Sequence, residues 1–199
     1  MDRREISVLE FALLGLLAQG PLSGYDLRRR FVETPMKHFS DSPGSIYPAL
    51  ARLRRKGLVA VAEEQPQSRR RKTLFRIAPA GLAALRAWIA GPVTRADVVG
   101  ALSELKLRFA FSASVVEATQ VVQFLEGFQH ELRRYAAELA GYYRKAAPGM
   151  SLTGRLALEN GLYEYRANVR WARSALAQLK RAAKTTRNSF RTPDRPRKT

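Results

Sequence analysis

Apolar residues recur at helical spacing in four segments near the start of the chain, and two short runs rich in β-formers separate the last two. The helical segments cover residues 6–18, 23–33, 41–58 and 78–90. The β-rich runs cover residues 58–64 and 72–77, and the polar stretch between them has the composition of a turn. The pattern therefore predicts three helices, a β-hairpin and a fourth helix.

The third predicted helix, residues 41–58, has one apolar side and one side that is small in its middle and basic toward its end. At 100° per residue, Ile46, Leu50 and Leu53 share the apolar side and are expected to pack inward. The opposite side carries Gly44, Pro48, Ala51, Arg52 and Arg55, with Tyr47 at its margin. Small residues allow close approach to a DNA groove, and arginines pair with phosphates or guanine edges. We interpret this segment as a DNA-recognition helix; the alternative is an ordinary amphipathic helix with a solvated basic face.

Capping residues indicate where two of these helices begin and end. Ser23 is expected to cap the second helix. Ser42 or Ser45 can cap the third, in which Pro48 is compatible only with the first turn. Gly57 is expected to end it.

The order of helices and hairpin is that of a winged helix-turn-helix, in which the third helix enters the major groove of DNA. The predicted hairpin tip carries the basic run Arg69, Arg70, Arg71 and Lys72. Arginines at such a tip favour the minor groove or the adjacent phosphates. Taken alone, a four-residue basic run is more often a solvated loop, so its position after a basic helix is what favours DNA contact.

The second half of the chain carries two heptad-like apolar seams, which predict two long helices packed as an antiparallel hairpin. The first seam is Val121, Leu125, Phe128, Leu132, Tyr135, Leu139 and Tyr142. The second is Leu158, Leu162, Tyr165, Val169, Ala172, Leu176, Leu179 and Ala183. Pro148 and Gly149 lie in the break between them. The fold class is therefore mainly α.

Such a hairpin cannot bury both helices by itself, and further apolar residues beside the seams invite a second copy or the N-terminal domain. We predict a homodimer through this half, with the helix at residues 103–111 as its link to the first half. The predicted dimer interface is Leu125, Phe128, Leu132, Tyr135, Leu139, Tyr142, Leu162, Tyr165, Val169, Trp171 and Leu176. The alternative is that the seams form only an intramolecular core.

These patterns divide the chain into three parts. Residues 1–91 are expected to form a winged helix-turn-helix DNA-binding domain, and residues 92–183 a helical dimerisation domain. Residues 184–199 combine charge, proline and threonine without periodicity, so we expect a disordered basic tail.

The net charge of +18 indicates a polyanionic partner, either nucleic acid or an anionic membrane surface. The N-terminal apolar run is too short to span a bilayer, so we expect a cytoplasmic protein that does not enter a membrane. The chain has no cysteine and two histidines far apart in sequence, and no HExxH, P-loop or GxSxG spacing occurs. We therefore expect no catalytic residue, no metal and no cofactor. Charge alone would also suit a non-specific architectural nucleic-acid-binding protein.

Three stretches resemble the winged-helix domain of PadR-family transcriptional regulators: LEFALLGLLAQGPLSGYDLRRRF, SPGSIYPALARLRRKGLV and RRRKTLFRIAPAGLAAL. The resemblance covers about residues 6–90, and the GSIYPAL core followed by RLxxxGLV is specific to that family. The chain departs from the family pattern at Ser23, where histidine is frequent, and at Ala78, where threonine is common. The C-terminal half is similar to the helical dimerisation region of the same family, with less specific motifs.

The resemblance implies a set of DNA-facing residues, a palindromic operator and a repressor that acts as a homodimer. The implied residues are Tyr25, Ser45, Tyr47, Pro48, Arg52 and the four wing residues from Arg69 to Lys72, to which the helix pattern adds Arg55 and Lys56. The resemblance further implies a small aromatic or cationic hydrophobic effector. Possible pocket walls are Trp88, Phe109, Phe111, Phe128, Tyr163, Tyr165 and Trp171. Aromatic residues at helical spacing are more often part of a core.

Overall fold

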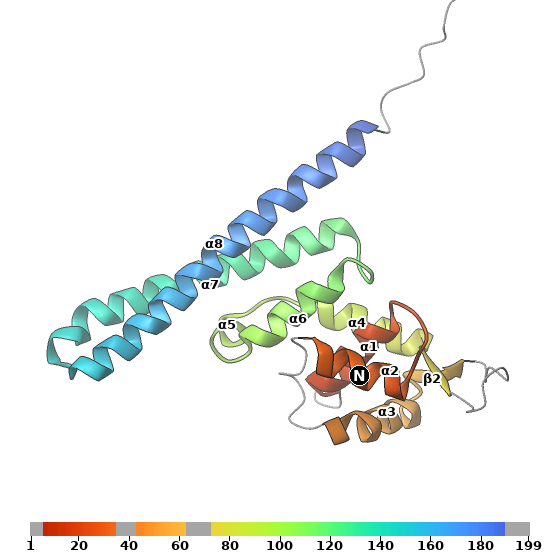
Figure 1. Ribbon diagram of the computed structural model, residues 1–199. Helices are drawn as coiled ribbons and strands as arrows, with labels where there is room; N and C mark the ends of the chain where they lie inside the picture. Colours follow the sequence, from red (N-terminus) through yellow and green to blue (C-terminus); the bar gives the residue numbers. More distant parts are fainter. Residues whose placement is uncertain (1–5, 35–42, 63–72, 190–199) are drawn as a thin grey trace, which may run out of the picture. The chain divides into compact units, whose positions relative to one another are not determined.

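A computed structural model describes residues 6–34, 43–62 and 73–189, which pack into two units (Figure 1). The first unit comprises residues 1–91 and 106–116, and the second comprises residues 92–105 and 117–199. The single boundary expected at residue 92 does not describe this division. The reason is that Leu107, Phe111 and Val115 belong to the hydrophobic core of the first unit.

The first unit is a winged helix-turn-helix with the predicted order of elements. Its elements are α1 (Val8–Leu17), β1 (Leu22–Ser23), α2 (Gly24–Glu33), a 3-10 turn (Pro43–Ser45), α3 (Ile46–Arg55), β2 (Val59–Ala62), β3 (Leu74–Ile77), α4 (Pro79–Ala90) and the second part of α6 (Leu102–Ser112). The four helices and two strands expected from the sequence are confirmed, with boundaries shifted by a few residues.

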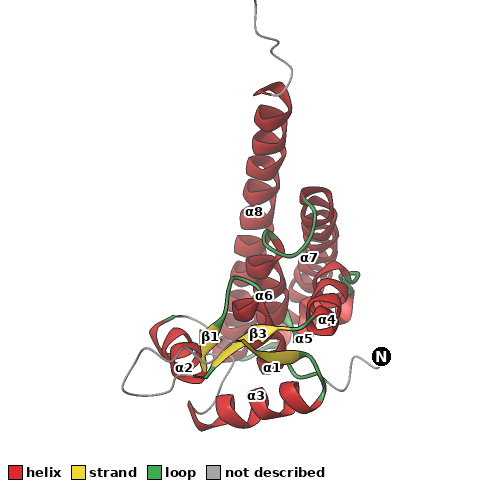
Figure 2. Cartoon of the chain, turned by 90° about the vertical axis from the view of Figure 1, so that its right-hand side faces the viewer, coloured by secondary structure: helices red, strands yellow, loops and turns green. Residues whose placement is uncertain are grey.

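The sheet contains one strand that the sequence pattern did not predict. The strand order is β1-β3-β2, with antiparallel pairing throughout, and Figure 2 shows the short strands in yellow. Leu22 pairs with Phe75, and Val59 pairs with Ile77. Because β1 spans only two residues, it is too short to give a period-two signal. The predicted tip of the β2–β3 hairpin lies outside the described residues.

Helix α1 forms the centre of the first unit, and nearly all its side chains are buried. The Phe11 ring stacks on Trp88 of α4, with ring centroids 4.4 Å apart. Gly15 allows the ring of Phe111 in α6 to approach closely, because a Cβ at this position would lie 2.5 Å from the ring. The buried α1 therefore supports the recognition helix on one side and α4 and α6 on others.

Local signals define the helix-turn-helix. The Ser23 hydroxyl accepts a hydrogen bond from the Asp26 N–H at 3.1 Å, which confirms the predicted cap of α2. At the end of α3, Gly57 adopts φ of 68°, and the Leu58 N–H donates to the Leu53 carbonyl at 2.9 Å. This is a Schellman ending, as expected for a glycine at that position.

The predicted cap at the start of α3 is wrong for Ser45, and Ser42 lies outside the described residues. Ser45 has helical dihedral angles, with φ of −78° and ψ of −19°, and its side chain makes no capping hydrogen bond. The 3-10 turn Pro43–Ser45 leads directly into α3, so the chain enters the helix without the extended residue that a side-chain cap requires.

The second unit is a long antiparallel helical hairpin with a short helix on one flank. It contains α5 (Arg95–Gly100), the start of α6, α7 (Ala118–Ala146), a 3-10 turn (Ala147–Gly149) and α8 (Leu152–Ser189). Tyr135 packs edge-on against Tyr165 at 4.6 Å, and Lys180 binds Glu126 at 2.6 Å. Residue numbers thus rise along α7 while those of their partners fall along α8, which confirms the predicted hairpin (Figure 1).

The tail prediction is wrong at its start, because α8 continues to Ser189 rather than ending near residue 183. The sequence after residue 183 lacks an apolar stripe. A helix can continue without one where its preceding turns are already formed, since propagation costs far less than nucleation. Residues 190–199 lie outside the described part of the chain.

Candidate nucleic-acid interface

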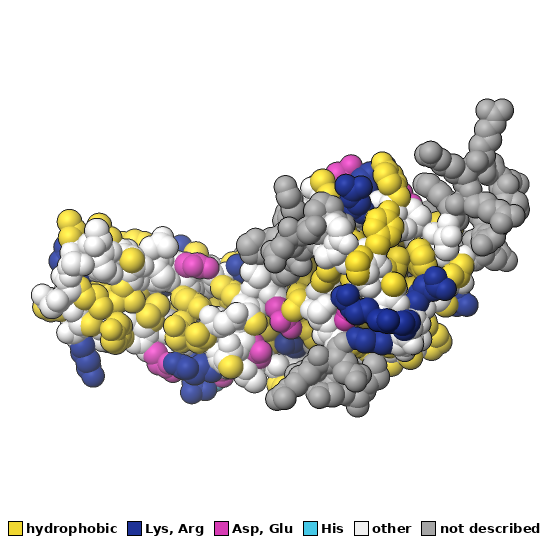
Figure 3. Space-filling view, turned by 90° about the horizontal axis from the view of Figure 1, so that it is seen from below, with side chains coloured by type: hydrophobic (Ala, Val, Ile, Leu, Met, Phe, Trp, Pro, Cys, Tyr) yellow, Lys and Arg dark blue, Asp and Glu magenta, His cyan; other side chains and the backbone are white. Residues whose placement is uncertain are grey.

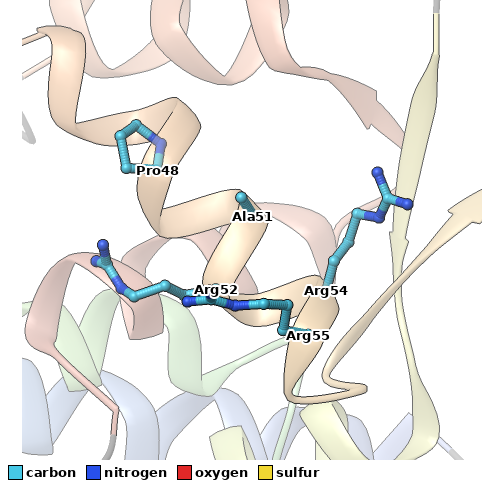
Figure 4. Close-up of a pocket in the computed structure, with 5 residues that line it drawn as sticks. All are labelled: Pro48, Ala51, Arg52, Arg54 and Arg55. Atoms are coloured by element: carbon cyan, nitrogen blue, oxygen red, sulfur yellow. The ribbon is translucent and has the colours of Figure 1, made fainter.

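The exposed side of α3 carries small side chains in its middle and basic ones toward its end, as predicted. Ile46, Leu50 and Leu53 are buried in the core, so the helix is fixed by its apolar side. Figure 4 shows Pro48, Ala51, Arg52, Arg54 and Arg55, which line an open depression on the other side. Lys and Arg side chains gather on the face of this unit that carries α3 (Figure 3).

Two exposed tyrosines lie at the starts of α2 and α3. The side chains of Tyr25 and Tyr47 are 56% and 50% exposed, although tyrosine usually hides part of its ring. The Tyr47 ring rests on Gly24, where an added Cβ would lie 2.7 Å from a ring carbon. The absence of a side chain at the first position of α2 therefore leaves room for the Tyr47 ring beside the helix start.

Arg54 and Arg55 are the least restrained cations of α3. Within the described residues, no carboxylate lies at ion-pair distance from either side chain, and both are exposed. Arg54 points in a different direction from Arg52 (Figure 4). Since Arg55 lies one turn beyond Ala51 on the same face, it extends the small surface with a positive charge.

Arg52 and Lys56 instead contact a buried acid of α1. The Arg52 Nε donates to Glu10 Oε1 at 2.8 Å, and Lys56 Nζ lies 3.4 Å from Glu10 Oε2. The Glu10 side chain is 2% exposed, whereas those of Arg52 and Lys56 are 42% and 29% exposed. Arg52 and Lys56, which were predicted to face DNA, thus each form an ion pair within the protein. Their contact with DNA remains a prediction.

Glu10 also helps to cap the start of α1. Its carboxylate accepts a hydrogen bond from the Ser7 N–H at 2.9 Å, and the Ser7 hydroxyl accepts one from the Glu10 N–H at 3.3 Å. Burial raises the pKa of Glu10. The Ser7 N–H, the Arg52 side chain and the charge of Lys56 outweigh that effect, so the pKa lies below its ordinary value of 4.5. Glu10 is therefore ionised at neutral pH.

Sequence reasoning missed Glu10 as a site residue, although a signal for it exists. Ser7 and Glu10 form the S-x-x-E pattern of a capping box directly before the apolar run of α1. That pattern predicts the cap but not the two cations, which come from a helix more than forty positions later. The wing residues Arg69, Arg70, Arg71 and Lys72 lie outside the described residues, so their contacts remain predictions.

The predicted dimer interface divides into three groups by exposure in the single chain. Leu125, Phe128 and Leu132 are fully buried, and Leu162 is 4% exposed, within the single chain. Their burial within the single chain fits the intramolecular alternative, and the contact of these four residues with a partner stays a prediction. Tyr142 and Trp171 are 56% and 39% exposed. The remaining five are half-buried: Tyr135, Leu139, Tyr165, Val169 and Leu176.

Other kinds of site have little support in the described parts of the chain. Histidine and carboxylate side chains there do not gather into a group that could hold a metal ion. No helix in those parts has the length and apolar character needed to cross a bilayer. Trp88, Phe111 and Phe128 belong to the buried cores, as expected for aromatic residues at helical spacing.

The fold and the basic third helix define a winged helix-turn-helix protein, and comparisons with known proteins identify its family. The model of the transcriptional regulator PadR-like family matches residues 13–87, and that of the virulence activator alpha C-terminal region matches residues 103–180. The negative transcriptional regulator PadR of Bacillus subtilis is 28% identical over 183 residues, which cover 86% of this chain and 97% of that protein.

Solved structures of the same relative also match. The crystal structure of B. subtilis PadR in complex with operator DNA is 26% identical, with 86% of this chain and 99% of that chain covered and a TM-score of 0.40. The complex with p-coumaric acid is 26% identical, with 87% and 99% covered and a TM-score of 0.38. The chain belongs to the PadR-like family of transcriptional regulators.

Proposed function

We propose that this regulator is a sequence-specific repressor that binds a palindromic operator as a homodimer. The observation that carries the proposal is the exposed face of α3, where Pro48 and Ala51 permit close approach and Arg55 supplies charge. Repression is supported by the B. subtilis relative, which is described as a negative regulator. A repressor of this kind acts where the chromosome lies, so we place it in the cytoplasm.

Direct contact with bases would come from α3, and the wing would add contacts with phosphates or the minor groove. Tyr25, Ser45, Tyr47 and Pro48 lie at or near the starts of α2 and α3, where the N-terminal residues of a recognition helix meet base edges. Arg69 to Lys72 are the proposed wing contacts.

Dimerisation would use exposed apolar residues of the helical hairpin. Tyr142, Leu152, Leu156, Tyr163 and Trp171 are all at least 39% exposed, which is unusual for large apolar side chains on two neighbouring helices. Of the predicted interface, Tyr142 and Trp171 belong to this group. Two-fold symmetry then matches a palindrome, because each protomer presents one recognition helix.

A small aromatic effector is the proposed release signal, with a cationic hydrophobic compound as the second class. The B. subtilis relative has been crystallised with p-coumaric acid, so that compound is the first to test. An effector acts here only if it binds the DNA-free form more tightly than the DNA-bound form.

Selection of binding sites from a random duplex pool at about physiological salt tests sequence-specific binding. We expect an enriched palindrome whose half-sites are about one helical turn apart, roughly 10 base pairs. A non-specific architectural protein would enrich no motif, and its binding would fade uniformly as salt increases. That outcome would contradict the proposal.

The variant Arg55→Ala tests the recognition face. A lost base contact should weaken binding to the selected palindrome by roughly 5- to 150-fold, while binding to random DNA changes little. The matched control is Arg133→Ala, which removes one exposed charge from the helical hairpin. Equal losses on both DNAs, with a salt slope lower by about 0.9, would limit Arg55 to a phosphate contact.

A further inference from the structure

We propose that Glu10 is a positioning residue for DNA recognition: it holds Arg52 and Lys56 against the protein, and so trades non-specific affinity for sequence discrimination. The inference rests on the proposed DNA-binding function. It adds an acid of the buried first helix to the residues that determine specificity, although Glu10 itself is too buried to contact DNA.

The geometry places one carboxylate between the two helices. Oxygen Oε1 accepts from Arg52 Nε, and Oε2 accepts from the Ser7 N–H and lies near Lys56 Nζ. The Ser7 hydrogen bonds fix the carboxylate to the first turn of α1, which is itself surrounded by core residues. Glu10 is thus a rigid anchor, while the cations are the long, flexible members of the contact.

The anchor restricts Arg52 more than Lys56. An arginine held through Nε has a defined guanidinium plane, since the group is planar and its donors have a fixed geometry. A fixed plane suits bidentate recognition of a guanine edge, whereas a free arginine can follow any nearby phosphate. Pairing with Glu10 therefore lowers the entropy that Arg52 would lose on meeting one particular base.

The anchor also reduces the charge that α3 offers to DNA. Arg52 and Lys56 carry two positive charges, and ionised Glu10 cancels one of them at a distance of 2.8 to 3.4 Å. Non-specific affinity depends on the number of phosphates neutralised. A buried acid beneath the recognition helix therefore lowers the affinity for every DNA sequence. The reduction is smallest on the operator, where Arg52 gains a contact with a base.

A purely structural ion pair would behave differently when Glu10 is changed. Loss of a structural contact weakens α3 and should lower binding to all DNA. Release of two restrained cations should instead raise binding to random DNA, while the advantage of the operator falls. The two roles therefore predict opposite signs for the change in non-specific affinity.

The test compares Glu10→Gln with Glu33→Gln in the full chain, on the selected palindrome and on random duplex DNA over a range of salt. Glutamine keeps the shape of the side chain and one acceptor oxygen, which can still accept from the Ser7 N–H, while its NH2 group would face Arg52 and cannot accept from it. Glu33 lies in α2 of the same unit and pairs with Arg29 at 3.6 Å, with both side chains exposed, so its variant makes the same change in net charge.

We expect Glu10→Gln to steepen the salt dependence on random DNA by about one to two units, at about 0.9 per added phosphate contact. The ratio of operator to random-DNA affinity should fall roughly tenfold, as for a disordered bidentate contact. Adding Arg52→Ala to Glu10→Gln should return the slope toward that of the parent chain. Thermal unfolding of each variant establishes that the chains compared are folded.

The inference is overturned if Glu10→Gln and Glu33→Gln change the slope equally, because net charge alone would then explain it. It is also overturned if binding of Glu10→Gln falls on both DNAs in parallel. Failure of the proposed function looks different, since the parent chain would then prefer no sequence. The slopes on random DNA would still test the release of Arg52 and Lys56.

Discussion

Replacing Phe128 by alanine is expected to destabilise the helical hairpin by about 3–5 kcal/mol, the usual cost of removing a buried phenylalanine. The ring is fully buried. It contacts Phe124 at a centroid distance of 6.1 Å and Trp171 at 6.2 Å in an edge arrangement. The cavity left by the substitution would lie between α7 and α8, where two helices are held by side-chain packing along one seam.

Chemical denaturation of the full chain measures this loss, with Arg173→Ala as the control. Arg173 lies on α8 with an exposed side chain, so its replacement should change stability by less than about 0.5 kcal/mol. The opposite outcome would be a loss of dimerisation without a loss of stability, which would show that Phe128 contacts a partner. If Phe128→Ala dissociates a dimer while the separated chain keeps its unfolding free energy, the intramolecular assignment is wrong.

Replacing Gly81 by alanine should destabilise the first unit by roughly 1–3 kcal/mol, the range found for overpacked cores. Helix propensity predicts the opposite sign, because alanine favours a helix over glycine by about 1 kcal/mol. At this position the cost of overpacking exceeds the gain in helix propensity. An added Cβ would overlap the Leu58 carbonyl oxygen, which also accepts a hydrogen bond from the Ala78 N–H at 3.0 Å. Backbone at the β2 start would have to move.

The control for Gly81→Ala is Gly127→Ala in the middle of α7. There the nearest atom to an added Cβ is Val93 Cβ at 3.9 Å, an ordinary contact. That substitution should stabilise the chain by about 0.4–1 kcal/mol. Thermal unfolding of both variants measures the difference. Equal stabilisation would contradict the prediction for Gly81→Ala, because it would mean that α4 can shift away from Leu58 at little cost.

The elements that could be predicted from the sequence are those with a strong local signal. The periodic leucines of α1, the Ser23 cap and the Gly57 ending each depend on residues within one or two turns. Strand β1 carries no such signal, since two residues cannot show a period. The return of α6 to the first unit also depends on a distant contact, that of Phe111 with Gly15.

The sequence predicted which face of α3 is exposed and basic, but not which other residues contact its side chains. Helical geometry places Arg52 and Arg55 on the outer side of α3, and both are there. The partner that restrains Arg52 lies in α1, and no local pattern connects the two. The seams correctly predicted the helical hairpin, but they do not say which residues meet a partner, because a heptad pattern is the same whether the second helix comes from this chain or from another.

Because Leu107 and Phe111 of α6 and Val115 just after it belong to the first unit, the winged helix is interrupted in sequence by the opening segment of the second unit. On the ribosome, the α1 core therefore stays incomplete until residues after Leu105 have emerged from the exit tunnel. A shortened product that stops at Gly91 would expose the apolar surface that those three side chains cover, which makes it a substrate for chaperones and proteases rather than a competing DNA binder. Gene fusions that exchange this unit between regulators would have to carry the residues up to Val116.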